Sequence, residues 1–265
     1  GIKAPEMPEP IATMSFAPVT PVFYASLREN IEEAKKYDKL KSFEELGQNQ
    51  GMAIYRTILP PGDAAELVFN RVADYAQLWL DGKRIATIDR RKKLSPVLIP
   101  KRNKSSVLEI VVEAMGHINF GAGMRDDRKG IIGDVKLGDD TLLNWTMSLK
   151  PIDEKSVVNA KRERRDAFSG GHYRATVMIE NPADTFIDMS KWIKGTVYVN
   201  GINIGRYWNV GPQLSLYCPA SFLKKGENTI DIIELELSEA RPIQGLEKAL
   251  YSGSDKSTKN AGNIW

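Results

Sequence analysis

Short apolar runs, each rich in β-branched and aromatic residues, follow one another from Met52 to Glu236 and are broken repeatedly by Pro, Gly, Asp or Asn. Branched and aromatic side chains pack well on a pleated sheet, and the breaking residues permit tight turns, so this pattern is typical of β-strands. Asp81-Gly82 lies between two such runs, and this dipeptide favours a type I′ hairpin turn. Many short strands and little helix predict an all-β fold of the β-sandwich or jelly-roll class.

The strand pattern also repeats within the chain. The stretch that begins LWLDGKRIATID lines up with the stretch that begins VYVNGINIGRYW. In each, an apolar strand leads to a turn, then to a strand that ends in proline, and then to a final apolar strand. The matching positions are Asp81-Gly82 and Asn200-Gly201, Pro100 and Pro219, and Ile110 and Ile232. Self-similarity of this kind indicates two similar units, so we predict two sandwiches in tandem.

Two further segments frame the predicted sandwiches. The N-terminal segment predicts an extended arm, since X-Pro bonds favour extended backbone; its prolines are Pro5, Pro8, Pro10, Pro18 and Pro21. The C-terminal segment is polar, which favours a tail without a core of its own. The predicted organisation is a Pro-rich arm or linker at 1–21, a first β-sandwich at 22–155, a second at 156–245 and a polar tail at 246–265.

A short helix is predicted where the arm meets the first sandwich. Ser26 and Glu29 have the spacing of a capping box, and apolar residues recur with a helical period as far as Tyr37. Ser42 and Glu45 repeat the capping pattern, so we expect one more capped turn there, ended by the glycine that follows two residues later.

Composition excludes several classes of partner. The chain has 265 residues, which suits one large or two ordinary domains, and a net charge of +3. Basic and acidic residues are interspersed, so no nucleic-acid face is predicted, and the basic run 161–165 is interpreted as a solvated linker. No apolar stretch is long enough for a membrane span. The single cysteine, Cys218, excludes an internal disulfide and is predicted to be buried.

No catalytic or metal-binding constellation is evident. Glycoside hydrolysis needs two carboxylates facing each other across a cleft, and no acidic residue here has a setting that supports that role. The two histidines, His117 and His172, lack neighbours at metal-ligand spacing, and His172 is expected near the start of a strand. The acidic pairs 126–127 and 139–140 show no accompanying carbonyl donors for Ca²⁺. We therefore predict no catalytic residue, no metal and no cofactor.

The segment GRYWNVGPQ has the residue types of a sugar-binding surface. Aromatic rings stack on the C–H faces of sugars, while arginine and amide side chains bond to hydroxyl groups. The candidate carbohydrate-binding residues are Arg206, Tyr207, Trp208, Asn209 and Gln213. The alternative is that these aromatics pack in a core. Strand alternation places Trp208 on one face with Ile204 and Arg206, and Tyr207 on the other, which favours partial burial of Trp208.

At these residues the sequence strongly resembles glycoside hydrolase family 35, the β-galactosidases. KGTVYVNGINIGRYWNVGPQLSLYCPASFLKKGENTIDIIELE (194–236) is similar to the family's C-terminal jelly-roll signature, and DTFIDMSKWIKG (184–195) to the segment before it. SFEELGQNQGMAIYRT (42–57), DYAQLWLDGKRIATIDR (74–90) and VLEIVVEAMGHINFGAGMRDDRKGIIGDVKLG (107–138) resemble the domain that precedes it. His117 stands where the family more often has arginine. The resemblance implies two tandem jelly-roll sandwiches, of which the second is galactose-binding-like.

Family members also carry an N-terminal (β/α)₈ barrel with two catalytic glutamates, and nothing in this sequence matches it. The resemblance therefore implies accessory domains that brace a catalytic barrel, contact galactose-containing glycans and are inactive alone. A stand-alone carbohydrate-binding module and a purely structural module with the barrel as its partner are the alternatives. As part of a secreted glycosidase, the chain would be periplasmic or extracellular.

Overall fold

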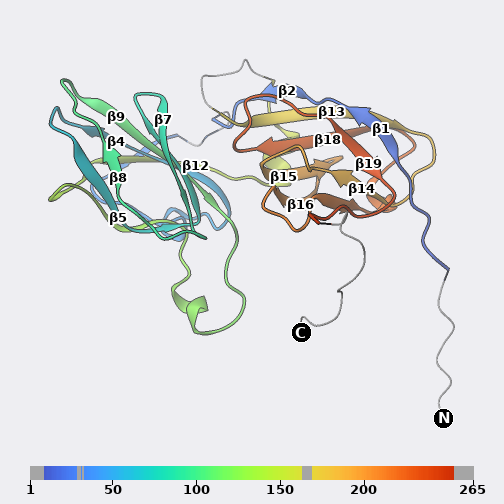
Figure 1. The fold of residues 1–265 in the computed structure, drawn as a ribbon, viewed down its shortest axis with the longest axis horizontal. Helices are drawn as coiled ribbons and strands as arrows, with labels where there is room; N and C mark the ends of the chain where they lie inside the picture. The colour runs from blue at the N-terminus through green and yellow to red at the C-terminus, as the bar shows by residue number, and fades with distance from the viewer. Residues whose placement is uncertain (1–8, 29–30, 32, 163–168, 254–265) are drawn as a thin grey trace, which may run out of the picture. The chain divides into compact units, whose positions relative to one another are not determined.

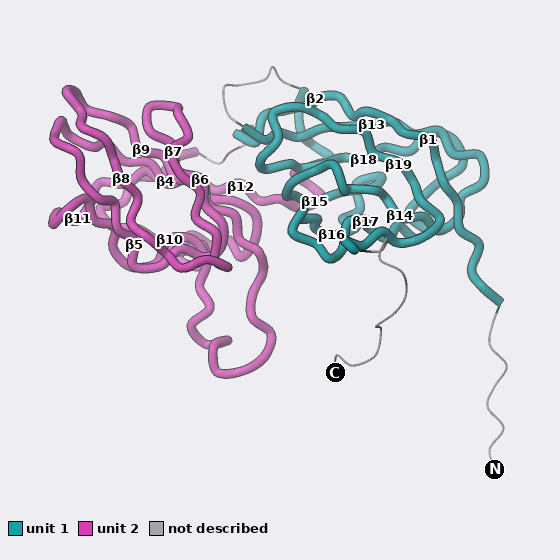
Figure 2. The backbone as a smooth tube through the Cα atoms, viewed as in Figure 1, with its two compact units in different colours: residues 1–29, 157–265 teal, residues 30–156 magenta. Residues whose placement is uncertain are grey.

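The computed structural model describes residues 9–28, 31, 33–162 and 169–253. It divides into two compact units, shown in different colours in Figure 2: unit 1 comprises Gly1–Glu29 and Val157–Trp265, and unit 2 comprises Asn30–Ser156. Each unit is built from two antiparallel β-sheets, as Figure 1 shows, so the predicted all-β sandwich class is confirmed. None of the helices in the described part of the chain has the length and hydropathy needed to cross a membrane.

Unit 2 packs a six-stranded sheet of order β3-β12-β4-β9-β6-β7 against a four-stranded sheet of order β11-β10-β5-β8. The bounds of its strands are β3 Lys35–Tyr37, β4 Gly51–Leu59, β5 Ala65–Ala73, β6 Tyr75–Leu80, β7 Lys83–Asp89, β8 Val97–Ile99, β9 Ser106–Ala114, β10 Gly130–Leu137, β11 Asp140–Thr141 and β12 Trp145–Lys150. The 3₁₀ helices η1 Glu44–Leu46 and η2 Ala122–Asp126 lie in its connections.

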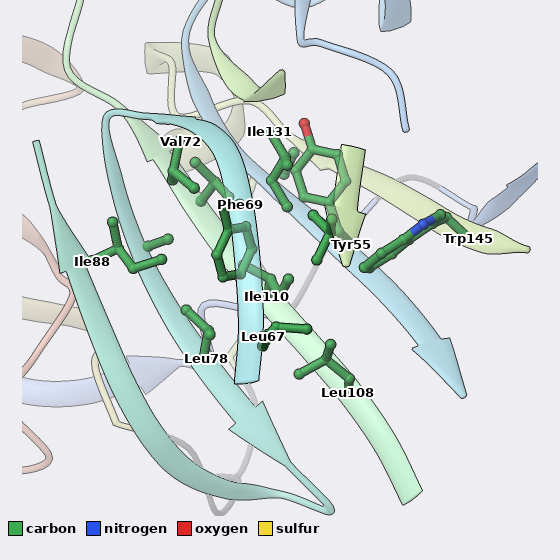
Figure 3. Close-up of a cluster of buried hydrophobic side chains, with 14 of the residues drawn as sticks. Tyr55, Leu67, Phe69, Val72, Leu78, Ile88, Leu108, Ile110, Ile131 and Trp145 are labelled. Atoms are coloured by element: carbon green, nitrogen blue, oxygen red, sulfur yellow. The ribbon is translucent and has the colours of Figure 1, made fainter. Parts of the chain in front are cut away.

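The core of unit 2 follows from strand alternation. In β5, Leu67 and Phe69 are buried while Val68 between them is exposed. These two side chains meet Leu78, Leu108 and Ile110 from the six-stranded sheet in the cluster of Figure 3. Burying such large apolar side chains contributes on the order of 1.5–3 kcal/mol each, so this cluster is the main source of stability of the unit.

Unit 1 packs a five-stranded sheet of order β16-β15-β18-β13-β2 against a four-stranded sheet of order β1-β19-β14-β17. The bounds of its strands are β1 Phe16–Val19, β2 Val22–Ala25, β13 Gly171–Ile179, β14 Thr185–Asp188, β15 Lys194–Val199, β16 Ile202–Trp208, β17 Ser215–Cys218, β18 Gly226–Glu234 and β19 Ile243–Leu246. The 3₁₀ helix η3 Ala220–Phe222 joins β17 to β18. Cys218 is fully buried in the core with Tyr173 and Ile232, as predicted.

The proline-containing N-terminal segment contributes strands to unit 1. β1 pairs with β19, and β2 pairs with β13, so strands from opposite ends of the chain share sheets. The sequence analysis assigned residues up to 21 to an arm and the residues after them to the first sandwich. In the structure, residues 1–29 belong instead to unit 1, together with the C-terminal part of the chain from Val157 onward. The spacing of prolines reports only on the backbone next to them, so it could not predict that β1 and β2 pair with strands from the other end of the chain. Pro5 and Pro8 of the predicted arm lie outside the described residues, as do residues 163–165 of the basic run and the tail from 254 onward.

The short helix predicted after Ser26 is wrong for the described residues. Lys35–Tyr37 forms strand β3, which pairs with Trp145–Met147 of β12, and the Ser26 hydroxyl accepts a hydrogen bond from the backbone N–H of Arg28 at 3.1 Å. Pairing with a distant strand therefore overrides the local helical period. A short α-helix, α1 Glu154–Val158, occurs elsewhere in the chain.

The second predicted capping pattern is confirmed at η1. The Ser42 N–H donates to Glu45 Oε2 at 2.8 Å, and the Glu45 N–H donates to Ser42 Oγ at 3.3 Å. Gly47 follows with a positive φ of 85°, the left-handed conformation that ends a helical turn.

The internal repeat is visible as two matching hairpins. Asp81 and Asn200 each have positive φ (49° and 51°), and each is followed by a glycine with positive φ, as a type I′ turn requires. Their side chains also play the same part: Asp81 Oδ1 accepts from the Val107 N–H at 2.8 Å, and Asn200 Oδ1 accepts from the Thr229 N–H at 3.0 Å. In each unit the turn is thereby bonded to the strand beside the hairpin.

Candidate carbohydrate-contact site

The candidate residues begin on β16, which contains a β-bulge. Opposite β15, Val197 pairs with Gly205 and Tyr198 pairs with Asn203, so Ile204 has no partner in the register. The extra residue interrupts the alternation of side chains. As a result both Ile204 and Tyr207 pack on the core of unit 1, and the predicted grouping of Ile204 with Trp208 is wrong.

Tyr207 is a core residue. Its side chain is buried, with 5% exposure, and its hydroxyl donates to Glu234 Oε2 at 3.0 Å. Gly195 makes room for this ring, because a Cβ there would lie 1.8 Å from the Ile233 carbonyl oxygen and 2.6 Å from the Tyr207 hydroxyl. Burial, followed by the nearby Glu234 carboxylate, raises the pKa of Tyr207 well above its ordinary value. Among the five candidates Tyr207 thus has a structural role.

Glu234 anchors Tyr207 from within the core. Its carboxylate also accepts backbone N–H bonds from Ile193 at 3.1 Å, Lys194 at 3.3 Å and Glu236 at 2.7 Å. Desolvation raises the pKa of Glu234 in spite of these bonds. This buried acid could not be predicted from the sequence, because most of its partners, Tyr207 among them, are distant along the chain.

Trp208 and Arg206 lie on the other side of β16. Arg206 is exposed and Trp208 is half-buried, and the Lys194 ammonium lies 4.7 Å from the centroid of the indole ring. A cation at that distance is attracted by the ring face. β16 is the end strand of its sheet, so the two side chains lie at a sheet edge.

Asn209 and Gln213 are exposed in the turn that follows β16. The Gly211 N–H donates to the Trp208 carbonyl oxygen at 3.0 Å and holds this turn against the end of the strand. Gln213 Nε2 donates to the Ser215 carbonyl oxygen at 3.0 Å, so its amide is oriented. The structure therefore places Arg206 and Trp208 on the end strand of a sheet, Asn209 and Gln213 in the turn that follows it, and Tyr207 in the core.

Unit 2 contains a buried ionic cluster that the sequence did not suggest. The fully buried Lys129 ammonium lies 3.1 Å from Asp74 and 3.2 Å from Asp127, and Arg90 pairs with Asp74 from the surface. Burial alone would raise the pKa of Asp127, but bonds from the Ile118 N–H and Lys129 lower it below the ordinary value. Removing one member of such a cluster would leave an uncompensated buried charge, and we assign the cluster a structural role.

The two histidines also make structural contacts. His117 Nδ1 lies 3.0 Å from the Asp127 carbonyl oxygen, and His172 Nε2 lies 2.6 Å from Asp231 Oδ1. His172 is the second residue of β13, as its sequence position indicated. Within the described ranges no group of three or more His, Cys, Asp or Glu side chains has the arrangement of a metal site.

Comparison with known proteins shows which family domains the two units match. Residues 41–153 match the family model described as "Beta-galactosidase, first all-beta domain", and residues 171–228 match "Beta-galactosidase, galactose-binding domain". The chain is 31% identical over 221 residues to "Beta-galactosidase" of Xanthomonas manihotis, covering 82% of this chain and 36% of that protein. It is 31% identical over 253 residues to "Beta-galactosidase-1-like protein 2" of Homo sapiens, covering 88% of this chain and 38% of that protein.

The two antiparallel sandwiches each match a separate domain model of the β-galactosidases. The chain belongs to the β-galactosidase family through its first all-β domain and its galactose-binding domain. It spans little more than a third of the length of the two relatives described above.

Proposed function

We propose that this chain is the non-catalytic, accessory part of a β-galactosidase-type glycoside hydrolase, and that it braces a catalytic (β/α)₈ barrel. The observation that carries the proposal is the pair of matches, in family order, to two all-β domains of β-galactosidases. The length relationship supports it, since the relatives contain about twice as much additional chain. The buried acids support it too, because Glu234, Asp74 and Asp127 are all engaged in internal bonds.

Turnover of a chromogenic β-galactoside tests the non-catalytic part of this proposal. The purified chain should hydrolyse no more substrate than buffer does, with the full-length Xanthomonas manihotis relative at equal molarity as the positive control. Turnover that rises with the concentration of the chain overturns the assignment. Turnover that does not co-elute with the chain on size-exclusion chromatography comes from a contaminant and does not count against the assignment.

The bracing role predicts a stable complex with the barrel. When a barrel-containing segment of the parent polypeptide is co-expressed with this chain, the two should co-purify, and the barrel should melt at a higher temperature than it does alone, because binding to the folded state stabilises it. The same barrel segment co-expressed with residues 30–156 alone is the matched control. A barrel that is equally soluble, active and thermostable without this chain excludes bracing.

A second candidate role is carbohydrate contact at the β16 edge, either within the hydrolase or as a stand-alone binding module. Trp208, half-buried beside Lys194, offers part of an aromatic ring, and Arg206, Asn209 and Gln213 offer hydrogen-bonding groups around it. Calorimetry with galactose and β-galactans tests this role, with Trp208→Ala and Tyr207→Phe as paired variants. The first should abolish the heat of binding and the second should preserve it. Loss of stability in Trp208→Ala without any sugar heat in the unsubstituted chain supports a purely structural role.

A further inference from the structure

A run of four cationic residues, RRKK (90–93), follows strand β7 in unit 2, and all four are exposed. Buried carboxylates hold the first two side chains in place. Arg90 Nη1 donates to Asp74 Oδ1 at 2.7 Å. Arg91 Nε donates to both carboxylate oxygens of Asp89 at 3.0 Å, and this bond lowers the pKa of Asp89. A guanidinium that is already fixed loses little conformational entropy when a ligand binds to it.

Two hollows in the surface of unit 2 have Arg90 in common. The first has a volume of about 350 Å³, and its lining includes Arg71, Arg90 and Lys92. The second has a volume of about 440 Å³, and its lining includes Arg90, Arg91 and His117. These five side chains define what we call the Arg90 surface. A ligand that extends across it can therefore contact cationic side chains in both hollows.

The carboxylates that hold the Arg90 surface lie beneath it. Asp74 and Asp89 are 1% and 9% exposed, and Asp74 is also bonded to the fully buried Lys129 ammonium at 3.1 Å. By contrast, the side chains of Arg71 and Arg90 are 43% and 42% exposed. The side chains that line the two hollows therefore present positive charge to the solvent.

Donor groups on the Arg90 surface remain available after its internal bonds are made. A guanidinium has five N–H groups, and within the described ranges the Arg90 side chain engages only Nη1, with Asp74. Lys92 is exposed, and in the same ranges its only bond is made by the backbone N–H, to the Asp89 carbonyl oxygen at 2.9 Å. The Nε and Nη2 groups of Arg90 and the Lys92 ammonium can therefore donate to a ligand.

Guanidinium and ammonium groups around one concave surface match the chemistry of oxyanions. Arginine binds phosphate and carboxylate groups through paired, charge-assisted N–H bonds, and lysine adds a compact positive charge. Because the two hollows share Arg90, a ligand with two or more linked anionic groups gains contacts from both. We propose that the Arg90 surface binds a small polyvalent oxyanion, of the diphosphate or polycarboxylate type. The inference concerns unit 2 alone and is independent of the accessory and carbohydrate roles proposed above.

Calorimetric titration with inorganic pyrophosphate and with citrate tests the proposal, at low ionic strength because salt screens surface charges. Phosphorus NMR detects bound pyrophosphate independently. The chain should bind pyrophosphate, citrate or both more tightly than it binds acetate, which carries a single charge and cannot engage both hollows.

Variants locate the bound anion. Arg90→Ala should weaken binding about ten-fold, as expected for the loss of a hydrogen bond to a charged group, and Lys92→Ala about three-fold. Arg90→Lys keeps the charge but not the paired N–H groups, so its affinity should fall between those of Arg90→Ala and the unsubstituted chain. Lys136→Ala is the matched control, because Lys136 is an exposed lysine on β10 of the same unit and lines neither hollow. Near-ultraviolet circular dichroism and the melting temperature check that each variant is folded.

Three outcomes overturn the inference. The first is the absence of both heat and a phosphorus NMR change at millimolar anion. The second is an equal loss of affinity in Lys136→Ala and Lys92→Ala, because binding then follows the net charge of the chain. The third is binding of a glutamate-rich peptide in place of both small anions, which indicates a protein partner. If Arg90→Ala fails to fold, Lys92→Ala decides the test, because it removes no internal side-chain bond within the described ranges.

Discussion

The Tyr207 hydroxyl donates to Glu234 Oε2 at 3.0 Å, with both side chains buried in the core of unit 1. Tyr207→Phe removes the donor and leaves a buried carboxylate with one bond fewer, so we expect it to lower the free energy of unfolding by about 1–3 kcal/mol. Urea unfolding measures this change. Tyr251→Phe, at a residue with 50% exposure, is the matched control and should change stability by much less. Equal stability of Tyr207→Phe and the unsubstituted chain contradicts the structural role.

Glu234 should also make the folding stability of the chain depend on pH. Desolvation raises its pKa above the ordinary 4.5 in the folded state, so the folded chain binds this proton more tightly than the unfolded chain does. The resulting contribution to stability is present below the ordinary pKa and is lost as the pH rises through the folded-state pKa. Glu234→Gln should therefore lose less stability than the unsubstituted chain when the pH is raised from about 4 to about 8. Parallel stability curves for the two proteins contradict this prediction.

Lys129 should be among the residues of unit 2 that are most sensitive to substitution. Lys129→Met removes the fully buried cation and leaves Asp74 and Asp127 without its charge. Breaking a buried pair from one side costs about 3–5 kcal/mol. Arg90→Ala removes a partner of Asp74 that is 42% exposed, and a surface pair contributes only about 0–1 kcal/mol. Chemical denaturation of the chain, followed by intrinsic tryptophan fluorescence, ranks the two variants, and a larger loss in Arg90→Ala contradicts the assignment.

Substitution in the Asn200 turn should lower the stability of the chain more than substitution in the matching Asp81 turn. Asn200→Ala removes the bond to the Thr229 N–H and also two amide bonds, to the Phe222 carbonyl and Asn228 Oδ1. Asp81→Ala removes the bond from the Val107 N–H and a bond to the Ser106 side chain. At about 0.5–1.5 kcal/mol for each hydrogen bond, the Asn200 variant should lose more stability than the Asp81 variant. Thermal melting of both variants checks the order, and Asn200→Gly, which restores the tolerance of positive φ, should recover only part of the loss.

The sequence predicted features that depend on neighbouring residues. The Ser42–Glu45 capping pair and the two turns at Asp81 and Asn200 are correct because each is determined by a few adjacent side chains and by backbone preferences at positive φ. The fold class also followed from local strand patterns, and the long similar segments indicated the β-galactosidase family.

Features that depend on distant partners were missed. The predicted helix after Ser26 is replaced in part by strand β3, because Lys35–Tyr37 pairs with residues more than a hundred positions away. Tyr207 was grouped with a ligand surface because simple alternation cannot reveal the bulge at Ile204. The contact between the rings of Phe186 and Tyr217 could not be predicted either, because the two residues come from separate strands and meet only through the register of β14 and β17.

The pairing of β1 with β19 and of β2 with β13 has a consequence for biosynthesis. Unit 2 is encoded as one uninterrupted stretch, so it has all of its own strands as soon as β12 has left the ribosome. Unit 1 is different, because its first two strands are made before unit 2 and must wait for partners that are translated after it. Domains generally fold as units in the order of synthesis. The N-terminal strands therefore remain unpaired while the ribosome makes the inserted unit and the strands beyond it. During that interval their exposed backbone and apolar side chains are available to a chaperone.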